Sequence, residues 1–456
     1  MASDLTLPGS STDVPHLRRG LTLWDLILYG FVMTSPTPGP QLGNSQVISH
    51  GHTVSTLLIG MIPMALTALS FGRLARIYPS AGSAYTYTSR GLNAHLGFVV
   101  GWAMFVEYMI LVVSSCVYIG LLVNRLLPEV PYVLAAALGV GVITYVNLLG
   151  IRWTALTNKV LMFLMTAVLV IFMLLAIRYI FHLQGWHGLV SLQPFYDPHT
   201  FDLHALAMGI AFMSVTYVGF DGVTTLAEEV KNPKRNVLLA TVLVCVLTGV
   251  FSIAQMYLAQ QVWPEFQNYQ NVDTVFMDVA RRVGGVLLFD AMAACIFINF
   301  LGTGLTGQVS SARLLFSMGR DGILPRKIFA RLDPKRANPT YNIWIIAILA
   351  FLGTQGLNWE GALEAFFSVT LFTYAAVNLA CLRQFYWLKQ ADRKPRLGVD
   401  AIAPFLAFVF CLADWWYLPW KANAFGLVAL GVGLLYDGII TRGFRTQPKM
   451  INFSQV

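Results

Sequence analysis

The stretch LILYGFVMTSPTPGPQLGNSQV, residues 26–47, decides how this chain folds. It begins as an apolar helix and then carries Pro36, Pro38 and Pro40 at every second position, with Gly39 between the last two. Each proline lacks the backbone N–H that a helix needs, and its ring clashes with the turn before it. The pattern therefore predicts a helix that breaks near residues 34–40.

A second apolar stretch, AFMSVTYVGFDGVTTLAEEV at 211–230, has Gly219 and Gly222 on either side of Asp221. Glycine lets a helix unwind at low cost. A second break is therefore predicted near residues 217–222.

The composition requires a lipid bilayer as solvent. Of the 456 residues, 56% are hydrophobic and only 11% are charged, whereas soluble domains carry about a quarter charged residues. Apolar stretches long enough to cross about 30 Å of hydrocarbon recur along the chain. We predict an all-α membrane protein with about twelve transmembrane helices, at residues 22–47, 53–73, 97–124, 132–149, 153–181, 204–228, 236–261, 284–316, 341–358, 361–387, 400–419 and 423–441.

The basic residues predict which side of the membrane each loop occupies. With both termini in the cytoplasm, the 182–203 loop lies outside and contains no Lys or Arg. The net charge of +8 is therefore a topology signal for an inner (plasma) membrane protein, and no nucleic-acid partner is predicted. Of the 30 Lys and Arg residues, those at or beyond the outer ends of the spans are Arg125, Arg178, Arg281, Arg282 and Lys421.

The two breaks fall in spans 1 and 6, the same place in two sets of five spans. Broken backbone is tolerated at mid-membrane only where it lines a cavity. Paired breaks indicate a transporter site between inverted repeats. For the first break alone, a proline kink without function is the alternative.

Three further motifs make the chain resemble the amino acid–polyamine–organocation superfamily of secondary transporters. They are YPSAGSAYTYTSRGLNAHLGFVVGW (78–102), VGFDGVTTLAEEVKNPKRN (218–236) and SSARLLFSMGRDGILP (310–325). The chain is most similar to the putrescine importer branch, which shares the AGSAYTY loop, an acid before a Tyr in span 3, and the GFD-x-VTTL-x-EE pattern. The resemblance implies secondary active transport of a small amine or an amino acid by alternating access, either ion-coupled or by exchange.

The resemblance also implies a LeuT-like fold, in which two inverted repeats of five helices carry the site and two peripheral helices follow. The organisation that we expect is a cytoplasmic tail at 1–20, a first repeat at 21–181, an extracellular loop at 182–203, a second repeat at 204–387, two peripheral helices at 388–441 and a cytoplasmic tail at 442–456.

Two carboxylates near mid-membrane are candidate substrate ligands, because an ionised group there is costly and usually functional. Each also has a structural interpretation: Glu107 as a buried acid tied to a neighbouring helix, and Asp221 as an N-cap that accepts from the amides of Val223 or Thr224. With the nearby aromatic faces, the acids favour a cationic amine such as putrescine, although neutral and cationic amino acids stay open. The predicted substrate-binding residues are Thr34, Ser35, Thr37, Gly39, Glu107, Tyr108, Val215, Tyr217, Gly219, Phe220 and Asp221.

The coupling ion is predicted to be H+ or Na+. Protonation of either acid would serve the first, while Thr303 and Thr306 in span 8 offer oxygen ligands for the second. The lysine that many members of the superfamily carry in the fifth span is replaced here by Met165. Lys159 lies nearer the cytoplasmic end, where we interpret it as a topology charge.

The cytoplasmic ends of the spans hold the gating candidates. Tyr85 and Tyr87 lie in a segment that either packs under the bundle as an inner gate or is merely interfacial. When the inner side is closed, the acids Glu228 and Glu229 are expected to pair with basic residues such as Arg313 or Arg320. For most charges of this loop, a solvated face is the alternative.

Other classes of function lack their signatures. The eight His residues lie at or beyond span ends, and no nucleophile–base pair or metal-ligand cluster lies within a span, so no enzyme is predicted. There is no Walker motif for ATP and no repeated filter of a channel. No cofactor or metal is expected, and nothing in the pattern specifies an oligomeric state.

Overall fold

The computed structural model describes residues 20–34, 37, 39–269, 272, 274–333, 336, 338–389 and 396–447. Within these ranges the regular structure is helical, apart from one bridge between Leu21 and Val230. Nine described helices are long and apolar enough to cross a membrane, and three shorter apolar helices accompany them. The α-helices are α1 (Leu23–Met33), α2 (Leu42–Ile48), α3 (Thr53–Ile77), α4 (Ser83–Gly91), α5 (Ala94–Leu126), α6 (Tyr132–Leu148), α7 (Ile151–Leu189), α8 (Leu203–Ser214), α9 (Gly222–Thr225), α10 (Pro233–Val262), α11 (Val275–Arg320), α12 (Arg326–Phe329), α13 (Thr340–Gly356), α14 (Trp359–Leu382), α15 (Ala403–Tyr417) and α16 (Trp420–Ile440).

Short helical turns of other types join these helices. The 3-10 turns are η1 (Gly39–Gln41), η2 (Val215–Tyr217), η3 (Ala227–Glu229) and η4 (Phe266–Asn268), and the π-helical turns are η5 (Arg383–Trp387) and η6 (Leu397–Ile402). Each predicted span coincides with one helix or, for spans 1 and 6, with a pair of half-helices.

The first break has the predicted place and cause. α1 ends at Met33, and the Thr34 N–H makes the last bond of the helix, to the Gly30 carbonyl at 2.8 Å. The next described helical turn is η1, and Pro36 and Pro38 lie outside the described residues. α1 and α2 are separate helices, as the missing donors of the prolines predict.

The second break depends on one glycine. α8 continues into η2, Val218 is extended, and Gly219 then adopts a φ of +122° before α9 begins. A Cβ on Gly219 would lie 2.9 Å from the Met33 carbonyl carbon. The glycine therefore permits both the left-handed backbone and the close approach of the two breaks.

The helices extend beyond the predicted spans in two places. α7 continues to Leu189 through a kink at Gly185, where φ is 61°, so helix occupies part of the expected 182–203 loop. α11 starts at Val275 and kinks at Gly284 and Gly285, ahead of the expected start of that span. A single glycine in the left-handed region turns the chain while helix continues on both sides, and apolar length alone does not reveal such a turn.

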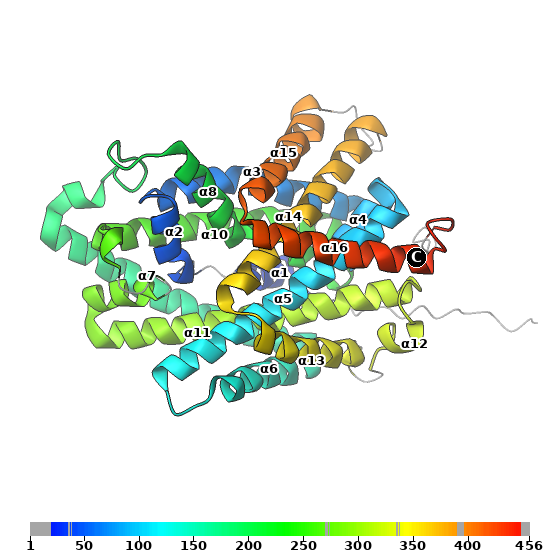
Figure 1. The fold of residues 1–456 in the computed structure, drawn as a ribbon, viewed down its shortest axis with the longest axis horizontal. Coiled ribbons are helices and arrows are strands. Elements are labelled where there is room, and N and C mark those ends of the chain that lie inside the picture. Colours follow the sequence, from blue (N-terminus) through cyan, green and yellow to red (C-terminus); the bar gives the residue numbers. More distant parts are fainter. Residues whose placement is uncertain are drawn as a thin grey trace, which may run out of the picture.

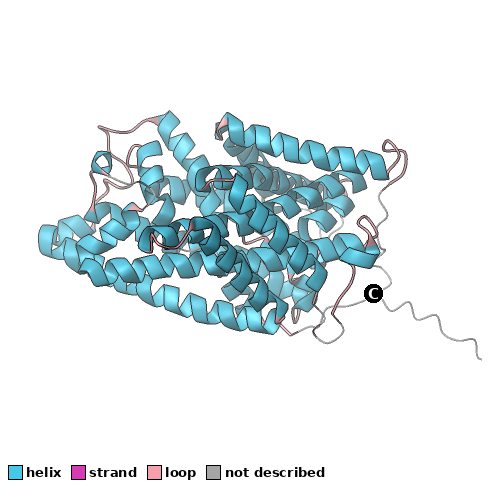
Figure 2. Cartoon of the chain, turned by 60° about the horizontal axis from the view of Figure 1, so that its bottom comes forward, coloured by secondary structure: helices cyan, strands magenta, loops and turns pink. Residues whose placement is uncertain are grey.

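Burial distinguishes central helices from peripheral ones. Buried residues make up 78% of the apolar window in α5 but only 17% of that in α16. The bundle is built of helices throughout its described part (Figure 2). α1 lies near its middle, and α15 lies at its edge (Figure 1).

The bundle has two ends, which we call the α4 face and the α8 face. In Figure 1 the labels of α4 and α12 lie at one end of the long axis, and those of α2 and α8 lie toward the other. At the α4 face the Tyr85 hydroxyl donates to Asp321 at 2.7 Å. At the α8 face the Asp197 N–H donates to His52 Nε2 at 3.1 Å. The structure thus separates the segments that the basic residues assign to opposite sides of the membrane.

Candidate substrate-binding site

A cavity with an empty volume of about 510 Å3 lies between the two breaks, α5, α11 and α14. It is nearer to the α8 face, because its α5 residues belong to the half of that helix farther from α4. Its lining residues are Met33, Thr34, Thr37, Pro40, Gln41, Leu111, Ser114, Ser115, Val215, Thr216, Val218, Phe300, Thr303, Trp359, Leu363 and Phe366.

Only part of the predicted site lines this cavity. Thr34, Thr37 and Val215 do so, and Ser35 lies outside the described residues. Gly39 faces α11 instead, where a Cβ would meet the Phe276 ring at 2.5 Å. The prolines predicted the break but not which backbone atoms it turns toward the cavity.

Two aromatic residues of the second break are turned into the core. The Tyr217 hydroxyl donates to the Leu57 carbonyl at 2.7 Å. The Phe220 ring packs against Phe71 and Tyr374, with centroids 5.7 and 5.2 Å away. Both side chains are fully buried, and neither is among the residues that line the cavity, so their contacts support the break.

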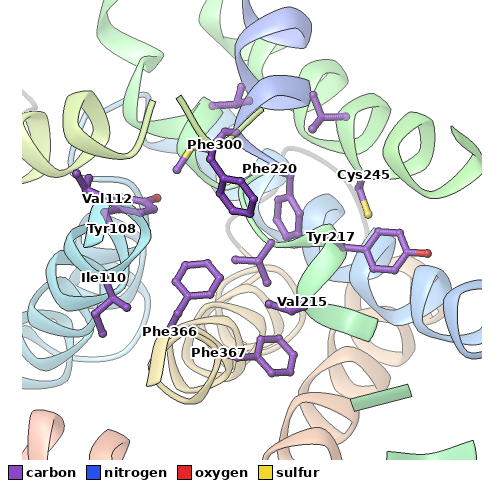
Figure 3. Packing of buried hydrophobic residues seen from close by; sticks show 14 of the residues in the cluster. Tyr108, Ile110, Val112, Val215, Tyr217, Phe220, Cys245, Phe300, Phe366 and Phe367 are labelled. Carbon is purple, nitrogen blue, oxygen red and sulfur yellow. The ribbon is translucent and has the colours of Figure 1, made fainter. Parts of the chain in front are cut away.

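Aromatic residues that the sequence analysis missed shape the cavity. Phe300 and Trp359 line it, and their rings pack edge-to-face at 5.1 Å. Figure 3 shows Phe220, Phe300 and Phe366 converging on the space between α5 and the second break. The only signal was an aromatic residue inside an apolar span, which many core positions share.

Asp221 is held by two tyrosines. The hydroxyls of Tyr108 and Tyr374 donate to its two carboxylate oxygens, the latter at 2.7 Å, and the Gly219 N–H donates at 3.2 Å. The predicted cap is wrong, because the side chain makes no bond to the start of α9. Its donors come instead from α5, α14 and the break, and Tyr374 was not predicted at all.

Glu107 has no such partners. It is fully buried, and neither carboxylate oxygen has a hydrogen-bond partner. The nearby Thr370 hydroxyl donates to the Phe366 carbonyl at 2.8 Å. Thr370 of α14 lies beside Glu107, but no hydrogen bond of normal geometry ties the carboxylate to that helix. Glu107 precedes the cavity residue Leu111 by about one turn of α5. It therefore lies on the same side of this helix as Leu111, but closer to the α4 face of the bundle.

The candidate ion ligands lie beside the first break. The Thr303 hydroxyl faces α1 and donates to the Val32 carbonyl at 3.3 Å. The Thr306 hydroxyl turns back to the Thr303 carbonyl at 2.9 Å. Thr303 therefore keeps a position from which it could bind an ion, whereas Thr306 bonds within its own helix.

Lys159 does more than mark topology. Its ammonium lies 2.5 Å from an Asp25 carboxylate oxygen, in the first turn of α1. The pair joins α7 to α1 beside a small cavity that Tyr29 also lines. The sequence could not show this pair, because its members are far apart in the chain.

The α4 face is closed by charged pairs between segments. Arg320 donates to both carboxylate oxygens of Glu228, at 2.9 and 3.0 Å, and Arg313 pairs with Glu229. The Ala81 N–H donates to Glu228 at 3.0 Å. The expected pairing of these acids is thus confirmed, and the pairs are largely buried instead of solvated.

The two gating candidates differ in their contacts. Tyr85 bonds Asp321, whereas the Tyr87 ring packs edge-to-face against Phe71 at 6.1 Å. Burial raises the pKa of Asp321 to about 6, although the Tyr85 hydroxyl and the Arg320 charge lower it. Only Tyr85 therefore belongs to the charged network of this face.

No group of three or more His, Cys, Asp or Glu residues that could hold a metal ion occurs in the described part of the chain.

Comparison with known proteins identifies the family. The model of the amino acid permease family matches residues 39–419. The chain is 28% identical to the low-affinity putrescine importer PlaP of Escherichia coli (strain K12), covering 95% of this chain and 96% of that protein. It is also 27% identical to the branched-chain amino acid permease BcaP of Bacillus subtilis (strain 168), covering 93% and 94%. The chain therefore belongs to the amino acid permease family, within the amino acid–polyamine–organocation superfamily, and is a membrane transporter and not an enzyme.

Proposed function

We propose that this transporter carries a small organic cation, such as putrescine (1,4-diaminobutane), and that Glu107 binds an ammonium group of the substrate. Transport of amines or amino acids is the activity named for its relatives. The observation that carries the choice of a cation is the buried carboxyl of Glu107, which lacks a hydrogen-bond partner and precedes the cavity residue Leu111 by about one turn of α5.

An ionised carboxylate buried without a partner costs several kcal/mol, so the protein needs a cation or a proton to compensate for it. Asp221 is a weaker candidate for direct binding, because three donors already occupy its oxygens. Glu107 is free to receive an ammonium that enters through the floor of the cavity.

The conformation supports an alternating-access cycle. The charged pairs close the α4 face, and the cavity lies toward the α8 face. With the α4 face and both termini in the cytoplasm of an inner membrane, this is the state that binds substrate from outside. The inner gate then includes Tyr85, and the two inverted repeats extend over 21–181 and 204–387.

Two ions could couple to this cycle. A proton would use Glu107 or Asp221, whereas sodium would use Thr303 beside the first break. Uptake under imposed proton or sodium gradients separates the two, and uptake that depends only on an internal counter-substrate identifies exchange.

The test is uptake of radiolabelled putrescine by proteoliposomes. Glu107→Gln keeps the shape and removes the charge, and loss of a charge-assisted bond costs roughly 1.5–3 kcal/mol, or about tenfold to a hundredfold in affinity. Asp290→Asn, a change at an exposed acid of α11, is the control and should leave the affinity unchanged.

An unchanged apparent affinity in both Glu107→Gln and Asp221→Asn would contradict amine pairing. A neutral amino acid held by the backbone of the first break would then be the better assignment, and branched-chain amino acids, the substrates named for one relative, would be the next compounds to assay.

A further inference from the structure

The polar side chains of the cavity fall into two groups. Those of the first group already have partners: Thr34 shares a hydrogen bond with Thr248 at 2.8 Å, and Thr303 donates to the Val32 carbonyl at 3.3 Å. The hydroxyls of Ser114 and Ser115 both donate to the Leu111 carbonyl, at 3.1 and 2.7 Å. These groups have little need of a ligand.

The polar side chains of the second group have oxygens without a hydrogen-bond partner. The side-chain oxygens Thr37 Oγ1, Gln41 Oε1 and Thr216 Oγ1 are buried and lack a hydrogen-bond partner. Thr37 and Thr216 are only 1% and 3% exposed. The Cys295 thiol, a polar neighbour of Thr37, donates to the Met165 carbonyl at 3.8 Å. Buried groups left in this state are costly unless something else satisfies them.

The origin of the three oxygens is informative. Thr37 and Gln41 belong to the first break and Thr216 to the second, and all three line the same cavity. They lie on the halves of spans 1 and 6 that point toward the α8 face, whereas Glu107 lies beyond the cavity floor, toward the α4 face. Between these three oxygens and Glu107, the cavity lining includes the apolar side chains of Leu111 and Phe366.

We infer that Thr37, Gln41 and Thr216 form a second ammonium-binding subsite, so that the cavity and Glu107 together recognise an unbranched substrate with an amine at each end. A primary ammonium has three N–H donors and no acceptor, which matches three unpartnered oxygens. The rings of Phe300 and Trp359 border the same cavity, and aromatic rings attract cations. No Lys or Arg occurs among the described lining residues. This inference rests on the proposed function, in which Glu107 holds the first ammonium.

The test measures binding of radiolabelled 1,4-diaminobutane to the full-length protein in lipid nanodiscs, with 1-aminobutane as competitor. Thr216→Val and Gln41→Leu should each weaken binding of the diamine about tenfold, the effect of one hydrogen bond to a charged group. The monoamine, held by Glu107 alone, should change by less than about twofold. Thr216→Ser keeps the hydroxyl and should restore diamine binding.

Two further variants complete the design. Ser70→Ala removes a hydroxyl of α3 that donates to the Leu66 carbonyl at 3.2 Å and does not line the cavity, so the diamine affinity should not change. Glu107→Gln should weaken binding of both amines, which tests the proposed function separately.

The inference is overturned if Thr216→Val or Gln41→Leu binds the diamine as tightly as the wild type. It is equally overturned if either variant weakens the monoamine by the same factor as the diamine. Both results would leave Glu107 as the amine ligand. By contrast, a wild-type protein that binds neither amine would refute the proposed function itself.

Discussion

At the scale of single residues, the two membrane acids have different surroundings and therefore different roles. Asp221 receives three hydrogen bonds and is part of the closed structure below the cavity. Glu107, on the neighbouring helix, receives none. The donors around the two carboxylates therefore differ, and in the proposed function Asp221 is a positioning residue and Glu107 a ligand.

The tyrosine on α14 gives a test of this division. Tyr374→Phe removes one donor to Asp221, and a hydrogen bond to a charged group contributes about 1.5–3 kcal/mol. We expect a lower unfolding temperature and a slower maximal uptake, with a smaller effect on the apparent affinity. Tyr132→Phe, which removes a bond of 2.8 Å to the neutral Thr354 carbonyl, is the control. Equal losses in the two variants would contradict a special role for Asp221.

Asp321 predicts a pH dependence of stability. Its pKa rises from 3.8 to about 6 in the folded protein, mainly through burial. The folded state therefore binds this proton more tightly than the unfolded chain, so the stabilisation is full below the unfolded pKa and is lost as the pH rises through about 6. Relative to the wild type, Asp321→Asn should be about equally stable at about pH 3, below both pKa values, and more stable by up to about 3 kcal/mol at about pH 8.

The Tyr85 hydroxyl provides the check on this assignment. It lowers the pKa of Asp321, so Tyr85→Phe should move the pH-dependent loss of stability to higher pH. Thermal unfolding followed across this pH range measures both variants. A difference between Asp321→Asn and the wild type that stays constant with pH would refute titration of Asp321.

At the scale of helices, the two broken spans are tied together at two levels. At mid-membrane, Gly219 packs against the end of α1. At the α4 face, the Leu21 N–H donates to the Glu229 carbonyl at 3.0 Å, and the Lys231 N–H donates to the Leu21 carbonyl at 2.9 Å. These backbone bonds connect the start of α1 to the end of span 6, so the two inner half-helices are expected to move together.

The contact at Gly219 makes a sharp prediction. Gly219→Ala meets both a φ of +122° and a backbone atom 2.9 Å from the new Cβ, so it should strongly reduce folded protein and its unfolding temperature. Gly141→Ala, in the middle of α6 with nothing within 4 Å, should instead stabilise the helix, by about 0.5–1 kcal/mol. Size-exclusion yield and thermal unfolding measure both. A tolerated Gly219→Ala would mean that the breaks do not need this close approach.

At the scale of the whole molecule, the placement of Lys and Arg predicts the orientation in the membrane. Moving Lys or Arg across a bilayer is costly, so loops rich in them stay in the cytoplasm. The segments that the basic residues group together are also grouped by contacts at the α4 face. The described cysteines are all buried, so the native chain gives little background in labelling experiments.

Labelling of single introduced cysteines tests this orientation. Gln193 and Lys327 are both exposed, the first near the α8 face and the second on α12. A membrane-impermeant maleimide should label Gln193→Cys in right-side-out vesicles, and Lys327→Cys only after the membrane is permeabilised. The reverse pattern would place the α4 face outside and contradict the proposed direction of the cavity.

The sequence by itself determined the membrane class, the order of the spans, both breaks and the likeness to one superfamily. These features follow from local chemistry: apolar length, prolines without donors, glycines that permit φ above zero, and the placement of Lys and Arg. Only the tertiary structure decided that Tyr374 holds Asp221, that Glu107 has no partner, and that Thr37, Gln41 and Thr216 share one cavity. Those facts depend on how each helix is rotated about its axis and packed against helices far away in the chain, and residue spacing within one helix does not encode this.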